Sequence, residues 1–454
     1  MTFDVIVIGS GQAGVPLATR LAAAGKRVLL AERGDLGGTC VNTGCTPTKT
    51  MMASARAAHV ARTAGRLGVR VPQVEVDLGA IADRKDAIVR RWREGVGKRV
   101  QVEGLTVLRG HARFVGEREV EISGEIHKAE TIVINTGARA LVPPIDGLGE
   151  TPWLDNASVM SLRDVPSHLL ILGGGYIGCE FGQMFRRFGS RVTIVDHSGH
   201  LLSREDPEIS CALEDIFRKD GIGLELNAKV VQVSGGAGAI CVRLDGGKEL
   251  RGSHLLVAVG RRPNTDDLGC DKGNVALDAK GFVVADDEYL TSAPGVYAVG
   301  DVLGGPQFTH TSWDDHRLLF DLLLGRSRRG RRGRFIPYTV FTDPQVAGVG
   351  LTESGARERG LPFETATMAF GSIARAIEVD ETAGLLKVIL DPQSERVLGA
   401  SIVGPEAGEL IHIFVVLMQG GATARAIVDA QFVHPTFAEG VQSLLMKLER
   451  YALR

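Results

Sequence analysis

The chain has 454 residues, of which 44% are hydrophobic and 23% charged, and these values are typical of a soluble globular protein with about three domains. Its net charge of −2 excludes a global field that would attract nucleic acid or an acidic membrane, and no apolar stretch reaches the length of a membrane span. Six cysteines are too few for a disulfide scaffold, so we expect a cytoplasmic protein in which a close cysteine pair serves redox chemistry.

The chain begins with a predicted unit of strand, glycine turn, helix and second strand. The apolar run DVIVIG is typical of a buried parallel strand, and the turn after it reads Gly9-x-Gly11-x-x-Gly14. Glycines let the backbone approach a pyrophosphate at the N-terminus of the following helix. Glu32 ends the next strand, where a carboxylate can accept hydrogen bonds from a ribose. The whole pattern predicts a dinucleotide site.

The segment GGTCVNTGCTPTKT follows and carries Cys40 and Cys45, which four residues separate. On a straight helix the two would lie about 7.5 Å apart along the axis, whereas a disulfide needs Cα atoms within about 7 Å of each other. The segment must therefore bend, and Asn42 and Gly44 permit this. Pro47 suits the first turn of a helix that begins near Cys45, and the N-terminus of that helix would stabilise a thiolate.

The middle of the chain predicts helices and then strands. Helical patterns rich in Ala and Arg cover residues 49–69 and 84–104, and strand-like segments cover 105–115, 119–124 and 131–138. This part of the chain would connect the first unit to a second one of the same kind.

The second unit, HLLILGGGYIGCEFGQMFRRFGSRVTIVD, has the turn Gly173-x-Gly175-x-x-Gly178 and the strand-end acid Asp196. A carboxylate there suits the 2′-hydroxyl of NADH and repels the 2′-phosphate of NADPH. We therefore expect NADH, with NADPH as the alternative because Arg204 could fold back. Two dinucleotide sites fit a relay between a diffusible nicotinamide nucleotide and a bound flavin.

The last third of the chain predicts strands, a basic segment and a mixed domain. Strands ending in glycine are predicted within 255–265 and 295–301, and the basic run GRSRRGRRGRF follows at 325–335. Such a run can bind nucleic acid, but no aromatic residues interleave the arginines, so we interpret it as a solvated linker. An apolar helix is predicted over 440–453.

The segment GGTCVNTGCTPTK resembles the redox motif of the class I pyridine nucleotide–disulfide oxidoreductases, which include dihydrolipoamide dehydrogenase, glutathione reductase and mercuric reductase. The resemblance covers nearly the whole chain, because both glycine turns and the motifs NTGA, VGRRPN, AVGD and HPTFAE follow in the family's order. It implies an α/β fold with two Rossmann-like dinucleotide-binding domains, for FAD and NAD, and a C-terminal α+β dimerisation domain. The implied boundaries are 1–147 and 269–334 for the FAD-binding domain, 148–268 for the NAD(P)H-binding domain and 335–454 for the dimerisation domain.

The resemblance also implies a catalytic cycle in a homodimer. NADH would reduce FAD, and FAD would open the Cys40–Cys45 disulfide. Cys45 would face the flavin as the charge-transfer thiol, and Cys40 would attack the acceptor. His434 of the partner subunit would act as general acid and base, with Glu439 to orient it. An imidazole suits this step because it titrates near neutrality and a carboxylate fixes its tautomer.

Further residues would bind the two cofactors. Lys49 and Glu180 would pair near the flavin and the nicotinamide, and Asp301 would bind the ribityl chain. No metal ligands are expected. The residues that the resemblance places at FAD or at the nucleotide are Gly9, Gly11, Gly14, Glu32, Arg33, Gly38, Thr39, Lys49, Thr136, Gly137, Gly173, Gly175, Tyr176, Ile177, Gly178, Glu180, Asp196, Gly260, Arg261, Gly300 and Asp301.

Several residues depart from the well-known members of the family. Thr46 and Thr48 stand where Ile or Val and Ser are usual, which makes the motif more similar to the mercuric-reductase-like and reactive-chlorine-response branch. Mercuric reductases carry a C-terminal cysteine pair, but no cysteine follows Cys270. Thr19 occupies the place of a substrate-binding arginine of glutathione reductases, and Phe432 replaces the first histidine of the dihydrolipoamide dehydrogenase motif.

These departures leave the electron acceptor open. We expect a small disulfide or related acceptor, with dihydrolipoamide dehydrogenase as the main alternative. An alternative of another class is a reductase of metal ions, such as Hg(II) or Cu(II), or of quinones, or an electron-transfer component on the same scaffold.

Overall fold

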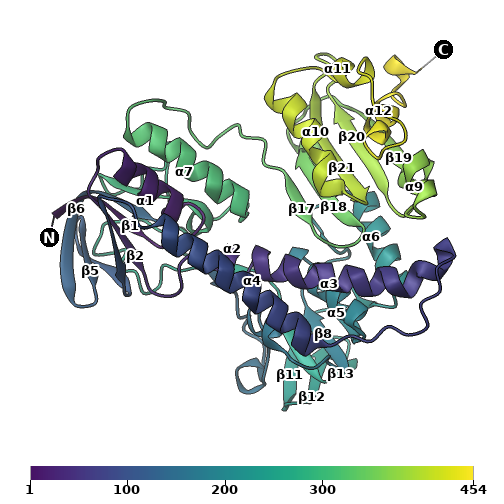
Figure 1. Cartoon of the computed structure of the whole chain (residues 1–454), viewed down its shortest axis with the longest axis horizontal. Helices are drawn as coiled ribbons and strands as arrows, with labels where there is room; N and C mark the ends of the chain where they lie inside the picture. Colours follow the sequence, from purple (N-terminus) through teal and green to yellow (C-terminus); the bar gives the residue numbers. More distant parts are fainter. Residues whose placement is uncertain (1, 453–454) are drawn as a thin grey trace. The chain divides into compact units, whose positions relative to one another are not determined.

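The computed structural model describes residues 2–452, and the chain divides into two compact units. Unit 1 consists of Met1–Thr50, Ala80–Leu141 and Gly260–Arg334, and unit 2 consists of Met51–Gly79, Val142–Val259 and Phe335–Arg454. The elements run along the sequence as Figure 1 labels them.

Unit 1 is built around a seven-stranded sheet in the order β3-β2-β1-β6-β5-β4, with β16 also paired to β6. The strands β1, β2, β3, β6 and β16 pair in parallel, while β4 and β5 form an antiparallel extension. Their bounds are β1 (Thr2–Ile8), β2 (Val28–Glu32), β3 (Leu105–Arg109), β4 (Ala112–Gly116), β5 (Glu119–Ile122), β6 (Glu125–Ile134) and β16 (Val296–Ala298).

Both faces of this sheet are covered. The helices α1 (Gly14–Ala23) and α7 (Thr309–Leu323) lie side by side in unit 1 (Figure 1). They share a core with Val5 and Val7 of β1, while Ile6 belongs to the core on the other face. Side chains alternate between the faces of a strand, so an uninterrupted apolar run is what a doubly covered strand requires.

The remaining elements of unit 1 surround the carboxyl ends of its parallel strands or join its segments. They are α2 (Gly38–Asn42), the first turn of α3 (Cys45–Thr63), most of α4 (Leu78–Arg99), the antiparallel pair β7 (Ala138–Ala140) and β15 (Arg261–Pro263), and the 3₁₀ helix η4 (Gly300–Leu303). The helices α3 and α4 both continue into unit 2.

Unit 2 contains a second parallel sheet, with strand order β10-β9-β8-β14. Its elements are β8 (His168–Leu172), α5 (Tyr176–Phe188), β9 (Arg191–Val195), α6 (Pro207–Lys219), β10 (Gly223–Glu225) and β14 (His254–Val257). A three-stranded antiparallel sheet adjoins it, made of β11 (Val230–Gly236), β12 (Ala239–Leu244) and β13 (Glu249–Gly252). The order of strand, glycine turn, helix and strand therefore occurs in both units, as the sequence predicts.

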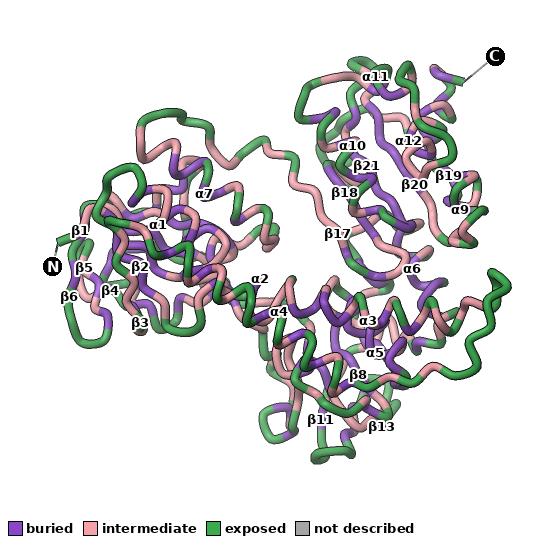
Figure 2. Tube along the Cα trace, in the orientation of Figure 1, coloured by how far each residue is buried: buried purple, intermediate pink, exposed green. Residues whose placement is uncertain are grey.

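Unit 2 also contains a five-stranded antiparallel sheet in the order β17-β18-β21-β20-β19. Its strands are β17 (Tyr338–Val340), β18 (Gln345–Gly350), β19 (Glu364–Ala369), β20 (Leu385–Leu390) and β21 (Val397–Gly404). The helices that accompany it are α8 (Glu353–Glu358), α9 (Ala374–Glu378), α10 (Ala407–Gln419), α11 (Arg425–Val428) and α12 (Glu439–Leu445). Figure 2 shows buried residues concentrated along β20 and β21, which α10 and α12 help to cover.

Three predicted helices have other bounds in the structure. The first runs as α3 from Cys45 to Thr63 and continues as the 3₁₀ helix η1 (Ala64–Leu67), and the second, α4, begins six residues earlier than predicted. The last helix, α12, ends at Leu445 rather than near 453, which lies outside the described residues. Beyond it, Arg450 binds Glu364, and these contacts direct the chain into a different path. No helix within residues 2–452 is both long and apolar enough to cross a membrane.

Arg326, Arg328, Arg329 and Arg332 of the basic run are exposed, as expected of a solvated linker, while its other two arginines hold the run on unit 1. Arg334 is nearly buried and pairs with Asp314 and Asp315 at 3.0 and 2.9 Å. The guanidinium of Arg331 donates to the carbonyl oxygen of Ala285 at 2.8 Å. No helix or strand forms over 326–337, so the run is irregular but held by its own arginines.

Candidate active site

The first glycine turn is tightly closed around backbone atoms of unit 1. Gly9 has a φ of +103°, and a Cβ on Gly14 would collide with the carbonyl oxygen of Gly9. The side-chain amide of Asn135 donates to that same oxygen at 3.0 Å. Glu32 accepts the amide and hydroxyl of Ser10 at 2.9 and 2.6 Å, which fixes the acid beside the turn. The N-terminus of α1 therefore faces the close backbone approach that a pyrophosphate needs.

The segment that begins the redox motif lies directly against this turn. A Cβ on Gly38 would come within 2.7 Å of the Cα of Gly11. The amide of Gly37 donates to the carbonyl oxygen of Ser10 at 3.2 Å, and the side chain of Gln12 donates to Gly37 at 3.3 Å. Tertiary structure thus joins two motifs that the sequence identified separately, the dinucleotide turn and the cysteine segment.

Buried polar atoms in unit 1 fit the FAD that the sequence predicts. The hydroxyl of Thr136 and the Nε of Arg261 are buried without a hydrogen-bond partner. Burial raises the pKa of Asp301 above its ordinary value, although Arg261 lies 3.8 Å away. Such groups suit a polar ligand with several hydroxyls, because an unpartnered buried polar group is otherwise costly.

The other residues predicted for this cofactor lie in the same unit. Thr39 belongs to α2, and Arg33 pairs with Asp267 at 3.2 Å. Gly137, Gly260 and Gly300 have positive φ angles of 68°, 140° and 75°, conformations that glycine adopts without strain.

The backbone bends between the two cysteines, as the sequence predicts. Cys40 lies in α2, which ends at Asn42, and Cys45 is the first residue of α3. The side-chain amide of Asn42 donates back to the carbonyl oxygen of Gly38 at 2.9 Å. A Cβ on Gly44 would come within 2.8 Å of the carbonyl oxygen of Thr39, so glycine is required at the bend.

No disulfide joins Cys40 and Cys45 in the structure, in which Cys45 is exposed and Cys40 is half-buried. The hydrogen bond between the two thiols, together with burial, raises the pKa of Cys40 far above the ordinary value of a cysteine thiol. The contact between the two sulfurs therefore disfavours a second negative charge on the pair. The sulfur of Cys45 lies 3.2 Å from the hydroxyl of Thr309, the first residue of α7. Two helix N-termini thus favour negative charge at Cys45.

Thr309 is a site residue that the sequence reasoning missed. Its contact with Cys45 spans 264 positions of sequence, and no motif of the chain points to it.

Lys49 and Glu180 belong to different units. Lys49 lies one helical turn after Cys45 in α3, and Glu180 is buried in α5. The carboxylate of Glu180 accepts the backbone amide of Phe341 at 2.9 Å. The predicted pairing of Lys49 with Glu180 stays a prediction.

The second glycine turn repeats the geometry of the first. Gly173 has a φ of +108°, and a Cβ on Gly178 would collide with the carbonyl oxygen of Gly173. A Cβ on Gly175 would meet no atom within 4 Å, so the outer side of the turn is open. Tyr176 and Ile177 form the start of α5 and are half-buried. The open glycine and the helix N-terminus fit the pyrophosphate of a nicotinamide nucleotide.

The acid after β9 is held at this turn by backbone amides. Asp196 accepts the amide of Gly174 at 2.5 Å and that of Ser198 at 2.7 Å. His197 lies next to it, with its Nδ1 3.4 Å from the same carboxylate. Arg204 is exposed, and no contact with Asp196 holds it. A fixed carboxylate therefore lies beside this turn, and such a carboxylate suits the 2′-hydroxyl of NADH.

A segment of the C-terminal domain, residues 338–343, follows one face of α5. Besides the bond to Glu180, the amide of Asp343 donates to Gln183 at 2.7 Å, and Gln183 donates to the carbonyl oxygen of Asp343 at 2.8 Å. The helix that carries the nucleotide turn is thereby attached to the five-stranded sheet within unit 2.

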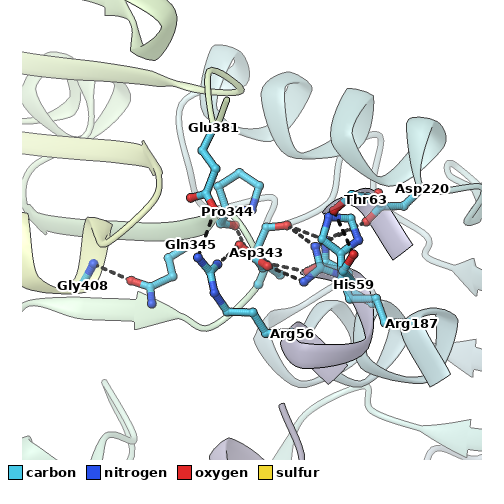
Figure 3. Close-up of polar contacts among 12 residues, drawn as sticks. Arg56, His59, Thr63, Arg187, Asp220, Asp343, Pro344, Gln345, Glu381 and Gly408 are labelled. Carbon is cyan, nitrogen blue, oxygen red and sulfur yellow. Dashed lines mark hydrogen bonds and ion pairs between the residues drawn. The ribbon is translucent and has the colours of Figure 1, made fainter. Parts of the chain in front are cut away.

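Figure 3 shows that the carboxylate of Asp343 lies between two arginines from different helices. Arg56 of α3 binds it at 2.5 Å, and Arg187 of α5 forms a shorter ion pair. Arg56 also reaches Glu381 at 3.1 Å. Although burial acts in the opposite direction, the two arginines keep the pKa of Asp343 below its ordinary value. The sequence reasoning did not find this cluster.

The predicted acid–base dyad forms within unit 2. The Nδ1 of His434 lies 2.8 Å from the carboxylate of Glu439, the first residue of α12. His434 is 70% exposed and Glu439 only 20%. The imidazole therefore turns one nitrogen to its carboxylate, while most of its surface faces outward. Phe432 packs against the core of the C-terminal domain instead of lining the dyad.

Comparison with known proteins gives the following matches. Residues 3–315 match the model of the pyridine nucleotide-disulphide oxidoreductase family, and residues 336–445 match that of its dimerisation domain. Dihydrolipoyl dehydrogenase from Thermus scotoductus is 34% identical over 100% of this chain and 98% of its own. Mercuric reductase from Staphylococcus aureus is 32% identical over 99% of this chain and 83% of its own. The solved Cu(II) complex of the HOCl-induced flavoprotein disulfide reductase RclA from Escherichia coli is 35% identical, with a TM-score of 0.90 over 98% of this chain and 100% of that one.

Proposed function

Since the chain belongs to the pyridine nucleotide-disulphide oxidoreductase family, whose members use FAD and NAD(P)H, we propose that it passes two electrons from NADH to the Cys40–Cys45 pair and on to a small disulfide. Bound FAD supplies the electron exchange between the nucleotide and the cysteines. The dimerisation domain supports a homodimer. We place the reaction in the cytoplasm, where a close cysteine pair serves catalysis more often than structure.

The residues of unit 1 bind FAD in this proposal. The turn from Gly9 to Gly14 binds the pyrophosphate, and the carboxylate of Glu32 accepts hydrogen bonds from a ribose. Thr136, whose buried hydroxyl lacks a hydrogen-bond partner, and Asp301, which is buried 3.8 Å from Arg261, bind hydroxyls of the ribityl chain. This arrangement is supported by the contact between Gly38 and Gly11, which keeps the cysteine segment beside the turn.

Thiol–disulfide exchange is the work of Cys40, Cys45 and His434. The Cys40 thiolate attacks a sulfur of the acceptor, which forms a mixed disulfide and releases one thiolate. His434 of the partner subunit takes the proton from Cys40 and gives it to that leaving thiolate. The Cys45 thiolate then attacks the sulfur of Cys40, so the second sulfur of the acceptor leaves as a thiolate that takes a proton from solvent, and the Cys40–Cys45 disulfide is restored.

NADH is the proposed electron donor, because of the fixed carboxylate of Asp196. A 2′-phosphate would meet this negative charge at a position where two backbone amides prevent the side chain from turning away. Arg204 is the residue that would have to move to accept NADPH instead.

Two other acceptors merit a direct comparison. Lipoamide, the cyclic disulfide to which dihydrolipoamide is oxidised, is suggested by the dihydrolipoyl dehydrogenase from Thermus scotoductus. Cu(II) is suggested by the solved structure of the Escherichia coli protein, which is a complex with that ion. Within residues 2–452, no group of three or more His, Cys, Asp and Glu side chains is arranged to hold a metal ion, so we propose a disulfide first.

The observation that carries the proposal is the environment of Cys45. It begins one helix, contacts the first residue of another, and belongs to a segment packed on the dinucleotide turn. An anaerobic titration of the purified holoenzyme tests it. NADH should reduce the flavin at lower concentration than NADPH does, and a long-wavelength absorption band from the Cys45 thiolate should appear after two electrons.

Cys45→Ser should remove that band, and Cys211→Ser, which changes an exposed thiol in α6, should keep it. The wild-type enzyme should reduce lipoamide, glutathione disulfide or another small disulfide more than 100-fold faster than the Cys40→Ser variant does. A loss of this size is expected when a nucleophile is removed. If wild type and Cys40→Ser reduced Cu(II) or a quinone at equal rates and neither reduced a disulfide, the proposed acceptor would be wrong. The metal ion or the quinone would then be the acceptor.

A further inference from the structure

Two tyrosine rings stack where residues 338–343 meet the start of α5. Tyr176 is the first residue of α5, and Tyr338 is the first residue of β17. Their ring centroids lie 5.7 Å apart, and the ring planes differ by 12°. Stacked aromatic pairs attract each other beyond the area that they bury. The ring of Tyr176 is therefore restrained by a residue of the C-terminal sheet.

Tyr338 is itself held firmly. Its hydroxyl donates a hydrogen bond to the carboxylate of Glu205. Gly348 lies opposite Tyr338 in the neighbouring strand, and a Cβ there would collide with the Tyr338 ring. The missing side chain of Gly348 thus leaves the space in which the ring lies flat.

The segment that carries Glu205 connects the glycine turn with the C-terminal sheet. The amide of Leu202 donates to the carbonyl oxygen of Gly174 at 2.9 Å, and the amide of Glu205 donates to Leu202 at 2.8 Å. The next residue, Asp206, binds the buried ammonium of Lys387 at 2.9 Å. The backbone hydrogen bonds before Glu205 and the ion pair of Asp206 after it therefore fix the position of Glu205. The hydrogen bond from Tyr338 to Glu205 in turn restrains Tyr338.

We propose that Glu205 and Tyr338 are positioning residues for the nicotinamide nucleotide, because they hold the ring of Tyr176 in place at the entrance of the second glycine turn. This inference rests on the proposed assignment of that turn to NADH. Tyr176 follows Gly175 directly and lies one helical turn before Glu180, so its ring borders the place where the nucleotide must pass along α5. A ring that is ordered in advance spares the nucleotide the cost of ordering it.

Titratable groups from three elements surround Glu205. Tyr338 of β17 and Tyr176 of α5 lie near it, and Lys387 of β20 is linked to it through Asp206. Arg204 and Asp206 are its neighbours in the chain. Burial raises the pKa of Glu205 to about 7, and Asp206 adds to the rise, while the bond from Tyr338 opposes it. Burial also raises the pKa of Tyr176, so that phenol stays protonated.

The Glu205–Tyr338 bond therefore changes strength near neutral pH. Above pH 7 Glu205 is a carboxylate, and a hydrogen bond to a charged acceptor is about twice as strong as a neutral one. Below pH 7 the protonated acid holds Tyr338 less firmly. Wild-type enzyme should consequently bind NADH more tightly at pH 8 than at pH 6.

The test is rapid anaerobic mixing of the FAD-loaded enzyme with NADH, which separates the dissociation constant from the limiting rate of flavin reduction. At pH 8, Tyr338→Phe and Glu205→Gln should raise the dissociation constant about two- to tenfold, the range for one side chain that loses its order. The limiting rate should change less than twofold. Glu205→Gln should also remove the difference between pH 6 and pH 8.

A double-mutant cycle shows whether the pair acts through Tyr176. Tyr176→Ala should raise the dissociation constant, and Tyr338→Phe added to it should have no further effect. Tyr451→Phe is the matched control, since it removes the bond from another tyrosine hydroxyl to another glutamate, Glu395, in the C-terminal domain. Its NADH affinity should equal that of wild type.

Unchanged affinity in both Tyr338→Phe and Glu205→Gln would overturn the inference, and so would a fall in the limiting rate at constant affinity. If Tyr338→Phe does not fold, Glu205→Gln decides alone, because it keeps the size of the side chain. Failure of the proposed function looks different, since NADH would then not reduce the flavin of the wild-type enzyme at all.

Discussion

At the scale of single residues, Asp343 is a charged position that the sequence reasoning did not consider. It joins Arg56 and Arg187, and its backbone exchanges hydrogen bonds with Gln183. Arg187 is only 7% exposed, so loss of the carboxylate would leave a nearly buried cation. Such a loss costs more than the pair itself contributes, because the remaining charge stays desolvated.

We expect Asp343→Asn to lower the free energy of unfolding by about 2–4 kcal/mol, somewhat less than for a fully buried pair because Arg56 is half-exposed. The pKa of Asp343 is lower in the folded chain than in the unfolded one, so its stabilisation is present above about pH 4 and lost as pH falls through the folded value. Urea unfolding at pH 7 and pH 3.5 measures this.

At pH 3.5 the difference between wild type and Asp343→Asn should shrink. Asp215→Asn is the control, because its partner Arg218 and the acid itself are both well exposed. It should change stability by less than about 0.5 kcal/mol. A constant difference for Asp343→Asn at both pH values would contradict the assignment of the effect to its charge.

At the scale of elements, each glycine turn works together with the helix and the acid that follow it. In both turns the third glycine lies against the carbonyl oxygen of the first, Gly14 against Gly9 and Gly178 against Gly173. In both, the strand-end acid accepts an amide from within the turn. These contacts therefore fix how close the start of the helix lies to the end of its strand. In this position the N-terminal amides of the helix can bind a pyrophosphate.

Gly178→Ala should separate α5 from its turn, because the added Cβ would collide with a backbone oxygen that cannot yield. A shift of about 1 Å at a cofactor site can cost about 100-fold in rate, so NADH-driven flavin reduction should fall by that order. FAD content should stay near wild type, because the residues assigned to FAD lie in unit 1. Flavin absorbance and stopped-flow reduction measure both.

Gly95→Ala serves as the matched control. Gly95 lies inside α4, where a Cβ would meet no atom within 4 Å, so alanine should add about 0.5–1 kcal/mol of stability and leave the reduction rate unchanged. If Gly178→Ala reduced its flavin as fast as Gly95→Ala, the second turn would not be the nucleotide site.

At the scale of the whole molecule, the two halves of the proposed exchange chemistry belong to different units. Cys40 and Cys45 lie in unit 1, while His434 and Glu439 lie in unit 2. The family supplies a dimerisation domain, and His434 presents its imidazole outward from that domain. A dyad that faces outward suits a cysteine pair on another subunit, because its own domain leaves 70% of the imidazole exposed.

Mixed dimers should reveal this arrangement. Dimers of Cys40→Ser alone and of His434→Gln alone should each lose disulfide turnover, the latter by about 100- to 10,000-fold for want of an acid and base. A heterodimer with one subunit of each kind has one intact site if the dyad acts across the interface, so it should regain about half of the wild-type rate. Differently tagged, co-expressed subunits supply it.

Dimers that combine Cys40→Ser with Cys45→Ser are the control, because no arrangement gives them an intact cysteine pair. A heterodimer of Cys40→Ser and His434→Gln that is as inactive as this control would show that His434 does not act on the partner subunit.

The sequence by itself determined the local features. Both glycine turns, the bend between the cysteines and the start of α3 at Cys45 agree with the structure, and the α/β fold with its C-terminal dimerisation domain is confirmed. These features depend on residues a few positions apart, whose backbone geometry is set by spacing and by the conformations that glycine and proline permit. The ends of helices were less well predicted, because contacts such as Arg450 with Glu364 decide them.

Only the tertiary structure decided which distant residues meet at these features. The contact of Thr309 with Cys45, the arginines around Asp343 and the support of Tyr176 by Tyr338 and Glu205 all join positions more than 100 residues apart. No periodicity or motif encodes such contacts, because they arise where separate elements pack against one another. The sequence thus identifies the groups proposed to react, and the packing of the C-terminal sheet on α5 decides how the second glycine turn is held.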